Sequence, residues 1–556
     1  MQKPINGNCS TEGFPEGQRS SSLIICPGAK ALPAGSSEER KGCGVKTFAA
    51  IDVGSYELSM KIFEFSPKIG IREIDHIRHR IDLGNDTFAT GKISYEKVDE
   101  LCRVLREFVD IMRGYKVEDF KAYGTSAIRE TENTMIVLDQ IRQRTGIRIE
   151  VLSNSEQRFL DYKSIALKGQ DFNKIIEKGT AIVDIGGGSI QVSLFDKDTL
   201  VATQNLRLGV LRLQELLNKL NAKPSKYEGL LEEIIESQLS VFKRMYLKDR
   251  TIDNIIIVDD YVSALIQKRL TGSQTPGYVD SASYEMFMQI MRTHTKEEIA
   301  ARFGISTESI PLIFISAVLI YRVALLMEAK LLWAPGVTLC DGIAYEFAEK
   351  NKIVGPKHDF EQDIVACARN ISKRFMGSRR RGETLEYICT TIFDSMKKVH
   401  GLGKRERLLL RIAALLHDCG KYISMVNLGE CSYSIVMATE IIGLSHKERE
   451  IVANVVKYNH QEFDYYEELG TTTTLDPQAY LTIAKLTAII RVANGLDRSH
   501  KQKFKDFKTT LREDQLIFTV NTAEDITLER GLFEAKASFF EEVFSVHPVI
   551  KQKKII

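Results

Sequence analysis

The sequence predicts an α/β protein of two similar lobes, followed by an all-helical region and a small α+β tail. The main observation is a short pattern that occurs at residues 48–63 and again at residues 180–195. In each copy an apolar run leads to an aspartate, glycine follows, and a second strand-like run begins. Glycine permits a tight turn between strands, so each copy predicts a β-hairpin. Two such hairpins indicate duplicated halves that face each other across a cleft.

The second copy, TAIVDIGGGSIQV at residues 180–192, carries the stronger sign of ligand binding. Asp184 lies near the end of the apolar run, where a carboxylate is placed to hold a metal ion. Backbone N–H groups that no side chain shields can hold phosphate oxygens. The turn residues that offer them are Gly186, Gly187, Gly188 and Ser189. A plain glycine-rich hairpin without a ligand explains the same residues, because such motifs are permissive.

Composition limits the class of protein. A chain of 556 residues predicts roughly three to four domains of about 100–200 residues each. Its hydrophobic content of 44% and charged content of 27% are ordinary for a soluble globular protein. The net charge of +2 gives no general attraction to nucleic acid or to acidic membranes, so we expect neither as a partner. Nine cysteines without CxxC pairs suit a reducing cytosol, and we expect a cytoplasmic protein.

Two segments could in principle be a membrane span or a targeting signal. Residues 312–321 form the longest strongly apolar segment, about half a membrane span, and Arg322 ends it, so we expect a core helix. Residues 1–46 are rich in Gly, Ser and Pro, and their apolar patch at residues 23–26 is too short for a signal peptide. We expect residues 1–46 to be a disordered extension; a mis-assigned start of translation is an alternative explanation.

The first lobe reads as strands, helix, strand and helix. Residues 95–113 predict an amphipathic helix, because their apolar side chains recur at helical spacing. Residues 121–130, KAYGTSAIRE, predict a strand that ends in a polar turn with Thr125, Ser126 and Arg129 on the cleft side. Arg129 has the fork geometry to clamp a phosphate. A surface arginine that caps a helix explains it equally well.

Residues 150–160, EVLSNSEQRFL, predict a strand that runs into a helix. Asn154 or Ser155 is the expected N-cap. Glu156 then lies in the first helical turn, where a carboxylate often does no more than stabilise the helix dipole.

The order of these motifs resembles the Ppx/GppA family, which comprises exopolyphosphatases and guanosine pentaphosphate phosphohydrolases. The segments that carry the resemblance are AAIDVGS (49–55), YGTSAIRE (123–130), VLSNSEQRFL (151–160), VDIGGGS (183–189) and LGVLRL (208–213). The resemblance extends from Thr47 to the C-terminus and implies an actin-like ATPase fold of the ribonuclease H-like type. The implied domains are lobe I (47–166), lobe II (167–350), a helical HD-like domain (351–505) and a small α+β domain (506–556).

The resemblance also implies roles for individual residues. Glu156 matches the glutamate that activates or positions the attacking water, Asp184 the aspartate that assists the metal and the water, and Arg129 the cleft arginine. The implied metal ligands are Asp52, Asp184 and Glu156, with Mg²⁺ as the expected ion because it prefers carboxylate and phosphate oxygens. The implied phosphate-binding residues are Gly54, Ser55, Thr125, Ser126, Gly186, Gly187, Gly188 and Ser189. Phosphoryl transfer to water needs these elements: an aligned water, a carboxylate and positive charge on the equatorial oxygens.

Several positions depart from the family pattern. Tyr56 and Glu57 replace small polar residues of the first hairpin, and a carboxylate there would repel phosphate. Further departures are Asp259, Asp260, Tyr261 and Cys340. From the residues that match the family, we expect Mg²⁺-dependent hydrolysis of a terminal phosphate from polyphosphate or guanosine pentaphosphate. Like the long family members, the chain is expected to form a homodimer. A catalytically weakened sensor of the same ligands is the alternative.

The helical region contains RIAALLHDCGKYI at residues 411–423, which resembles an HD-type domain through the His417–Asp418 pair. The positions that match its early His and distal Asp are Arg381 and Asn494, so too few ligands remain to hold a metal tightly. We expect His417 and Asp418 to be structural.

Basic residues recur in this region. They are Lys373, Arg374, Arg379, Arg380, Arg381, Lys501, Lys503 and Lys505. They suit either solvated helix ends or a track for a long polyanion, which behaves electrostatically like a nucleic-acid backbone. The tail predicts strands around residues 516–520 and 543–550, with a helix over 527–542 between them.

Overall fold

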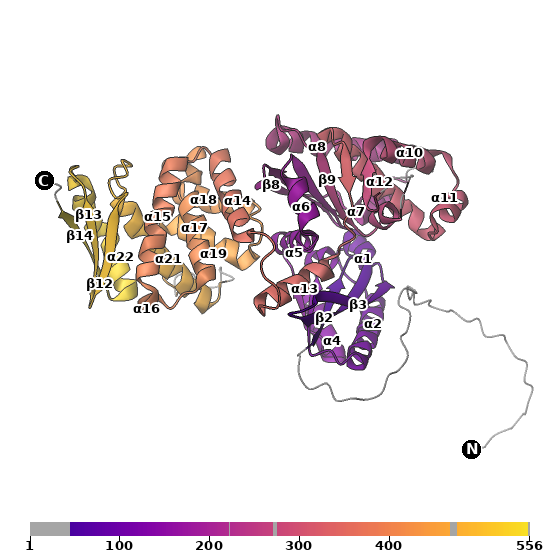
Figure 1. The fold of residues 1–556 in the computed structure, drawn as a ribbon, viewed down its shortest axis with the longest axis horizontal. Helices are drawn as coiled ribbons and strands as arrows, with labels where there is room; N and C mark the ends of the chain where they lie inside the picture. The colour runs from indigo at the N-terminus through magenta and orange to yellow at the C-terminus, as the bar shows by residue number, and fades with distance from the viewer. Residues whose placement is uncertain (1–44, 222, 269, 271–274, 467–474, 554–556) are drawn as a thin grey trace, which may run out of the picture.

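The computed structural model describes residues 45–221, 223–268, 270, 275–466 and 475–553 (Figure 1). The predicted extension at residues 1–46 therefore lies almost wholly outside the described residues. The described chain forms two α/β lobes, a helical domain beside them and a small domain at the far end (Figure 1).

Lobe I is built on a five-stranded sheet of order β3-β2-β1-β4-β5. Its strands are β1 (Lys46–Val53), β2 (Glu57–Ser66), β3 (Gly70–Arg80), β4 (Asp119–Gly124) and β5 (Ile149–Val151). Its helices are α1 (Leu83–Thr90), α2 (Tyr95–Gly114), α3 (Ser126–Glu130) and α4 (Thr134–Thr145). The amphipathic helix predicted at residues 95–113 is confirmed as α2, which buries Val98, Leu101, Leu105 and Phe108.

Lobe II is built on a six-stranded sheet of order β10-β11-β9-β6-β7-β8. Its strands are β6 (Thr180–Ile185), β7 (Ile190–Asp196), β8 (Thr199–Leu206), β9 (Asn254–Asp259), β10 (Tyr278–Asp280) and β11 (Leu331–Trp333). Its helices are α6 (Gln170–Ile176), α7 (Val210–Lys219), α8 (Tyr227–Phe242), α9 (Ser263–Gln267), α10 (Ser281–Thr293), α11 (Lys296–Phe303) and α12 (Ile310–Met327).

The two sheets share the same central arrangement. In lobe I the hairpin strands β1 and β2 are antiparallel, and β1 also pairs in parallel with β4. In lobe II the hairpin strands β6 and β7 are antiparallel, and β6 pairs in parallel with β9. The predicted two-lobed fold with duplicated halves is thus confirmed. Asp52 and Asp184 occupy matching places, one residue before the end of the first hairpin strand in each lobe.

Helix α12 contains the apolar segment predicted as core. By length and composition alone, Thr307–Met327 could cross a membrane, but 67% of its most apolar window is buried inside the protein. It packs against α7, α8 and α10 of lobe II. Its apolar side chains therefore belong to the core of this lobe.

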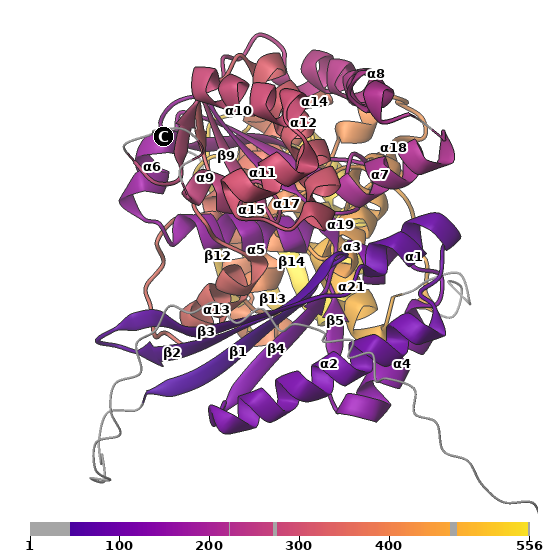
Figure 2. The same cartoon turned by 90° about the vertical axis from the view of Figure 1, so that its right-hand side faces the viewer.

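Helices α5 (Asn154–Ala166) and α13 (Leu339–Lys350) pack against each other between the lobes (Figure 2). The predicted boundary at residue 350 assigned α13 to lobe II, whereas α13 packs on β1 and β2 of lobe I. The reason is its apolar face: Ile343, Ala344 and Ala348 share a core with Phe48 and Phe65.

The helical domain contains α14 (Phe360–Arg374), α15 (Arg379–Ser395), α16 (Lys397–His400), α17 (Lys404–Leu416), α18 (Leu428–Ala438), α19 (His446–Tyr458) and α21 (Pro477–Leu496). Helix α14 packs on β8 and so joins this domain to lobe II. The tail forms a three-stranded sheet of β12 (Phe507–Arg512), β13 (Gln515–Asn521) and β14 (His547–Lys553), with α22 (Thr527–Phe544) packed on α21. The last strand starts later than predicted, because α22 continues through Phe544.

Candidate active site

The two hairpin turns meet at the base of a cleft between the lobes. The Ser55 and Ser126 hydroxyls lie 3.0 Å apart, and Ser55 Oγ also accepts a hydrogen bond from the Ala127 N–H. A Cβ on Gly187 would lie 2.9 Å from the Ser55 Cβ, so this turn approaches lobe I as closely as only glycine allows. Ser55 and Ser126, predicted to bind phosphate, line the cleft, are both buried and join the two loops. Thr125 is buried beside them, where its N–H donates to the carbonyl of Val53.

The triple-glycine turn is held from below by helix α7. The N–H groups of Leu211 and Arg212 donate to the Gly187 carbonyl at 3.0 and 3.1 Å. In the described part of the chain, no hydrogen bond has the N–H of Gly187 or Gly188 as its donor. Of these two residues Gly187 lines the cleft, so its N–H remains available to a ligand there.

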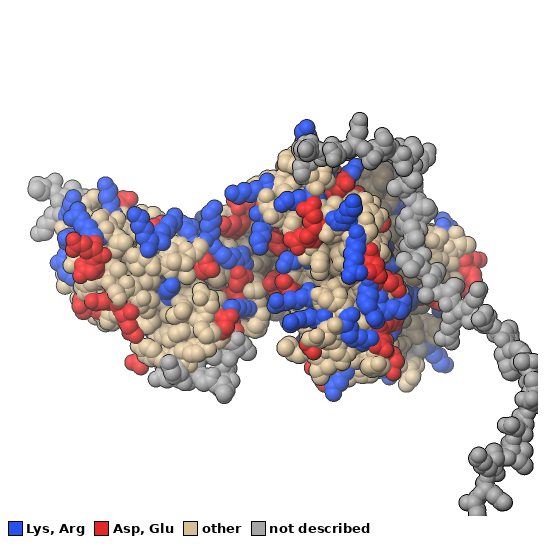
Figure 3. All heavy atoms as spheres, turned by 90° about the horizontal axis from the view of Figure 1, so that it is seen from below, with Lys and Arg blue, Asp and Glu red and all other residues tan. Residues whose placement is uncertain are grey.

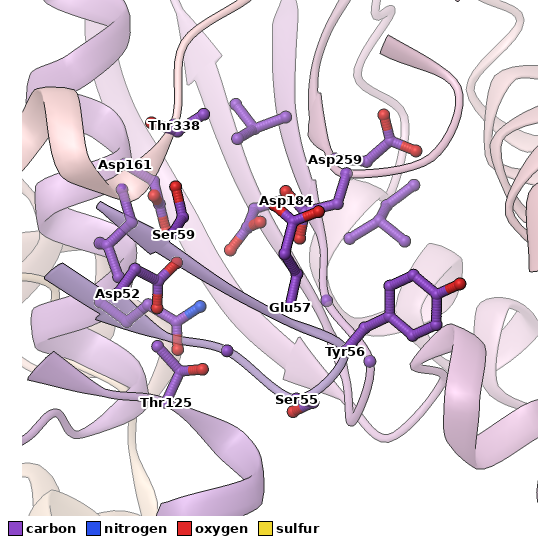
Figure 4. Close-up of a pocket in the computed structure, with 18 of the residues that line it drawn as sticks. Asp52, Ser55, Tyr56, Glu57, Ser59, Thr125, Asp161, Asp184, Asp259 and Thr338 are labelled. Carbon is purple, nitrogen blue, oxygen red and sulfur yellow. The ribbon is translucent and has the colours of Figure 1, made fainter. Parts of the chain in front are cut away.

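The cleft itself is small and strongly acidic. Its volume is about 70 Å³. Figure 4 shows carboxylates that reach it from both lobes. They are Asp52, Glu57, Asp161, Asp184, Asp259 and Asp260. Of the described residues that line the cleft, Arg78 is the one Lys or Arg. A polyanion that enters therefore needs further positive charge beside its phosphate.

Three of these carboxyl groups lie deep in the cleft. Burial, followed by the charges of Asp184 and Asp52, raises the pKa of Asp161 well above its usual range. Burial likewise raises the pKa of Asp184 to about 6, although a hydrogen bond from Asp161 and the charge of Arg158 oppose the rise. Burial and the charges of Asp260, Glu57 and Asp184 raise the pKa of Asp52. Burial and mutual repulsion therefore both favour the protonated forms of these three groups.

The three acidic residues that depart from the family pattern, Glu57, Asp259 and Asp260, have different surroundings. Glu57 points into the cleft (Figure 4). Its carboxylate pairs with the Arg78 guanidinium at 2.5 Å. Asp259 is structural, because it accepts hydrogen bonds from the N–H groups of Val262 and Ser263 at 2.8 and 2.6 Å. Desolvation within the cleft, followed by the nearby Glu57 charge, raises the pKa of Asp260 to about 7.

Tyr56 bridges the lobes at the side of the cleft. Its ring centroid lies 5.8 Å from that of Tyr261 in lobe II. The Arg80 guanidinium lies over the Tyr56 ring at 4.6 Å, and Arg80 also pairs with Glu308 of lobe II at 3.4 Å. The residue that replaces a predicted phosphate contact thus holds the two lobes together.

Glu156 and Arg129 lie outside this cleft, contrary to the roles implied by the resemblance. The Glu156 carboxylate accepts hydrogen bonds from the N–H and hydroxyl of Ser153 at 3.0 and 2.7 Å. Ser153, rather than Asn154 or Ser155, is the N-cap of α5, and Glu156 completes its capping box. Arg129 donates to the Leu152 carbonyl at 2.7 Å.

Glu156 and Arg129 line a separate pocket at the junction with the helical domain. The remaining charged or ionisable side chains there are Glu440, His446, Lys447 and Arg449.

A helix turns by about 100° per residue, so residues one position apart face different directions. From α5, Gln157 and Asp161 line the cleft instead of Glu156. Their four-residue spacing is the signal by which the sequence could have revealed them.

The helical domain brings together the four positions matched to HD ligands. The Arg381 guanidinium donates to the Asn494 side-chain carbonyl at 2.9 Å, and the Asp418 and Asp497 charges act on it. His417 is buried, with Nδ1 2.8 Å from the Ala414 carbonyl, and Asp418 pairs with Lys421 at 3.3 Å. The Arg381 guanidinium thus places a positive charge among the residues that match the ligands of an HD metal site.

The basic residues of the C-terminal half do not form one class. Arg381 is buried, and Lys503 pairs at 2.8 Å with the buried Glu529, so neither belongs to a solvated track. Arg379 is exposed and pairs with Glu383 at 2.8 Å. On the face in Figure 3, Lys and Arg side chains are interspersed with Asp and Glu rather than gathered into one stripe.

Comparison with known proteins gives matches along most of the chain. Residues 64–350 match the Ppx/GppA phosphatase family, and residues 366–536 match Ppx/GppA phosphatase, domain III. The chain is 20% identical over 478 residues to guanosine-5'-triphosphate,3'-diphosphate pyrophosphatase of Vibrio atlanticus, covering 85% of this chain and 92% of that protein. It is 28% identical over 240 residues to exopolyphosphatase 1 of Mycobacterium leprae, covering 42% of this chain and 68% of that one.

Among solved structures, an exopolyphosphatase from Cytophaga hutchinsonii matches with a TM-score of 0.48 and 17% identity, covering 56% of this chain and 100% of that chain. The family match begins at residue 64, beyond the first hairpin turn. The sequence departures at Tyr56 and Glu57 therefore lie just outside it.

Proposed function

The chain belongs to the Ppx/GppA phosphatase family, and we propose that it hydrolyses the terminal phosphoanhydride bond of inorganic polyphosphate or of guanosine pentaphosphate. The relatives named as a pyrophosphatase and as an exopolyphosphatase support this class of reaction. The observation that carries the proposal is the interlobe cleft. There the turn residues Gly186 and Gly187 line a space of phosphate size together with carboxylates of both lobes, and within the described residues the Gly187 N–H donates no hydrogen bond.

The chemistry needs little from the protein beyond position and charge. A water oxygen bonds to the terminal phosphorus, the bond from phosphorus to the bridging oxygen breaks, and the shortened chain leaves with that oxygen. The N–H group of Gly187 would stabilise charge on an equatorial oxygen. A carboxylate of the cleft would orient the water and accept its proton.

A divalent cation fits the residues present. The donors are carboxylate oxygens, which Mg²⁺ prefers. Asp52 Oδ1 and Asp161 Oδ2 are buried without a hydrogen-bond partner among the described residues, as expected of oxygens that bind a cation. We propose that Asp52 and Asp184 hold Mg²⁺, which would neutralise the cleft and the phosphate charge.

The size of the cleft limits how a substrate enters. A space of about 70 Å³ suits one phosphoryl group with water, whereas pockets for larger ligands measure about 300–1,000 Å³. The rest of either substrate then lies outside the cleft. Both candidate substrates end in the same phosphoryl group, so the proposed chemistry serves either one.

A sensor that binds these ligands without turnover is the second candidate. The observation in its favour is that Glu57 brings a carboxylate into the cleft, while α5 presents the neutral amide of Gln157. Such a site would lack a strong base at that position, so a bound ligand would not be hydrolysed.

One set of assays separates the candidates. Phosphate release is measured with polyphosphate and with guanosine pentaphosphate, with and without Mg²⁺, and compared with Asp184→Asn as the inactive control. Calorimetric titration of the same ligands measures binding. Release that depends on Mg²⁺ and on Asp184 supports the hydrolase. Binding without release supports the sensor, and neither binding nor release overturns both.

A further inference from the structure

Asp161 is a cleft carboxylate that neither the sequence motifs nor the family resemblance singles out. It is 3% exposed and lines the cleft beside Asp52 and Asp184 (Figure 4). Its Oδ2 atom has no hydrogen-bond partner among the described residues. A buried ionisable oxygen without a partner is costly in a folded protein, so its presence calls for an explanation.

The orientation of α5 explains how Asp161 reaches the cleft. Arg158 extends into lobe II, where its guanidinium donates to Gln191 at 2.9 Å and also to Thr203. Glu156 is held on another side of the helix by Ser153. With both of these side chains fixed, the acidic residue that α5 directs into the cleft is Asp161.

The surroundings of Asp161 are mostly acidic. The charges of Asp184, Asp52 and Asp260 act on its carboxyl group, and Asp184 also shares a hydrogen bond with it. Arg158 is the nearby positive charge, but within the described ranges it forms no ion pair with Asp161, and its guanidinium donates to Gln191 and Thr203 of lobe II. Three carboxylates from β1, α5 and β6 therefore share one small space.

We infer that Asp161 helps Asp52 and Asp184 to hold the divalent cation, directly or through the waters that the cation keeps, and that Asp161 is the acidic residue of α5 that serves the cleft. This inference rests on the proposed function, because the cation is the one that the phosphate chemistry requires. The described residues form no ready cage of three or more ligands. Mg²⁺ does not need one, since it commonly keeps several waters and binds substrate phosphate oxygens beside one or two carboxylates.

The test measures cation binding by the full chain without substrate. Mn²⁺ serves as the probe, because its free form is counted by electron paramagnetic resonance, and Mg²⁺ is used as the competitor. The variants Asp161→Asn and Asp161→Ser remove the carboxylate in two ways. Glu156→Gln is the matched control, since it removes the same charge from the same helix outside the cleft.

We expect both Asp161 variants to weaken Mn²⁺ binding by about 10–100-fold, with Glu156→Gln within about twofold of wild type. Without metal, Asp161→Asn should unfold at the same or a higher temperature than wild type, because it removes a charge from a crowded acidic site. Unchanged Mn²⁺ affinity in both Asp161 variants overturns the inference, as does an equal loss in Glu156→Gln.

The outcome is separable from that of the proposed function. If wild type binds Mn²⁺ through Asp161 but releases no phosphate, the cation site stands and the hydrolase fails. If wild type releases phosphate but the Asp161 variants bind Mn²⁺ as tightly as wild type, the proposed hydrolase activity is supported and the assignment of Asp161 is wrong.

Discussion

Neutralising Glu57 is expected to increase the activity of this protein. Glu57→Gln removes a carboxylate that points into the cleft but keeps the size of the side chain. A bare carboxylate about 4 Å from a phosphate charge costs about 4 kcal/mol at an effective dielectric constant of about 20. Arg78, paired with Glu57 at 2.5 Å, offsets part of this repulsion, and both side chains keep some contact with solvent, Glu57 at 19% exposure and Arg78 at 42%. We therefore expect a gain of about 1–2 kcal/mol, or about 5–30-fold in kcat/KM.

The assay is initial-rate phosphate release at fixed Mg²⁺ with both substrates. Glu64→Gln is the matched control, because Glu64 also lies on β2 and pairs with an arginine, Arg72, but does not line the cleft. The control should change kcat/KM by less than about twofold. A fall in activity would mean that Glu57 helps to hold the cation, and no change would mean that Arg78 already neutralises it. Either result refutes the reasoning.

Replacing Glu156 by Gln should lower the free energy of unfolding by about 0.5–2 kcal/mol, because it weakens the α5 capping box, and should leave phosphate release within about twofold of wild type. A loss of about 10²–10⁴-fold in turnover would instead show that Glu156 acts as the general base. Because the pKa of Asp184 is about 6, above the value of about 3.9 in an unfolded chain, the folded state binds the extra proton. Urea unfolding of the metal-free protein should therefore show wild type losing about 2 kcal/mol relative to Asp184→Asn between pH 4 and about pH 7; a relative gain as pH rises would contradict this. Gly209→Ala should lower the free energy of unfolding by about 1–3 kcal/mol, because its Cβ would lie 2.2 Å from the Gly188 carbonyl carbon. Gly229→Ala in α8, which meets no atom within 4 Å, is the control and should stabilise by about 0.4–1 kcal/mol; equal effects of the two substitutions in thermal unfolding would show that the close contact is unimportant.

Features encoded in short stretches were predictable from the sequence alone. An aspartate before glycine between two apolar runs specifies a hairpin, and its repetition specifies a second lobe, because turn conformation and strand alternation depend on nearby residues. The same holds for α2, whose apolar residues recur at helical spacing. The family resemblance is also confirmed, because residues 64–350 and 366–536 match the two Ppx/GppA models.

The direction of individual side chains depended on the tertiary structure. The sequence showed Glu156 and Asp161 on one helix, but only the anchoring of Arg158 in lobe II and of Glu156 on Ser153 determines which acid enters the cleft. Likewise, the pairing of Glu57 with Arg78 joins β2 to β3, and α13 returns to lobe I through contacts with strands far away in the chain. A local pattern specifies the conformation of an element, whereas the rotation of that element about its axis is set by the long-range packing against it.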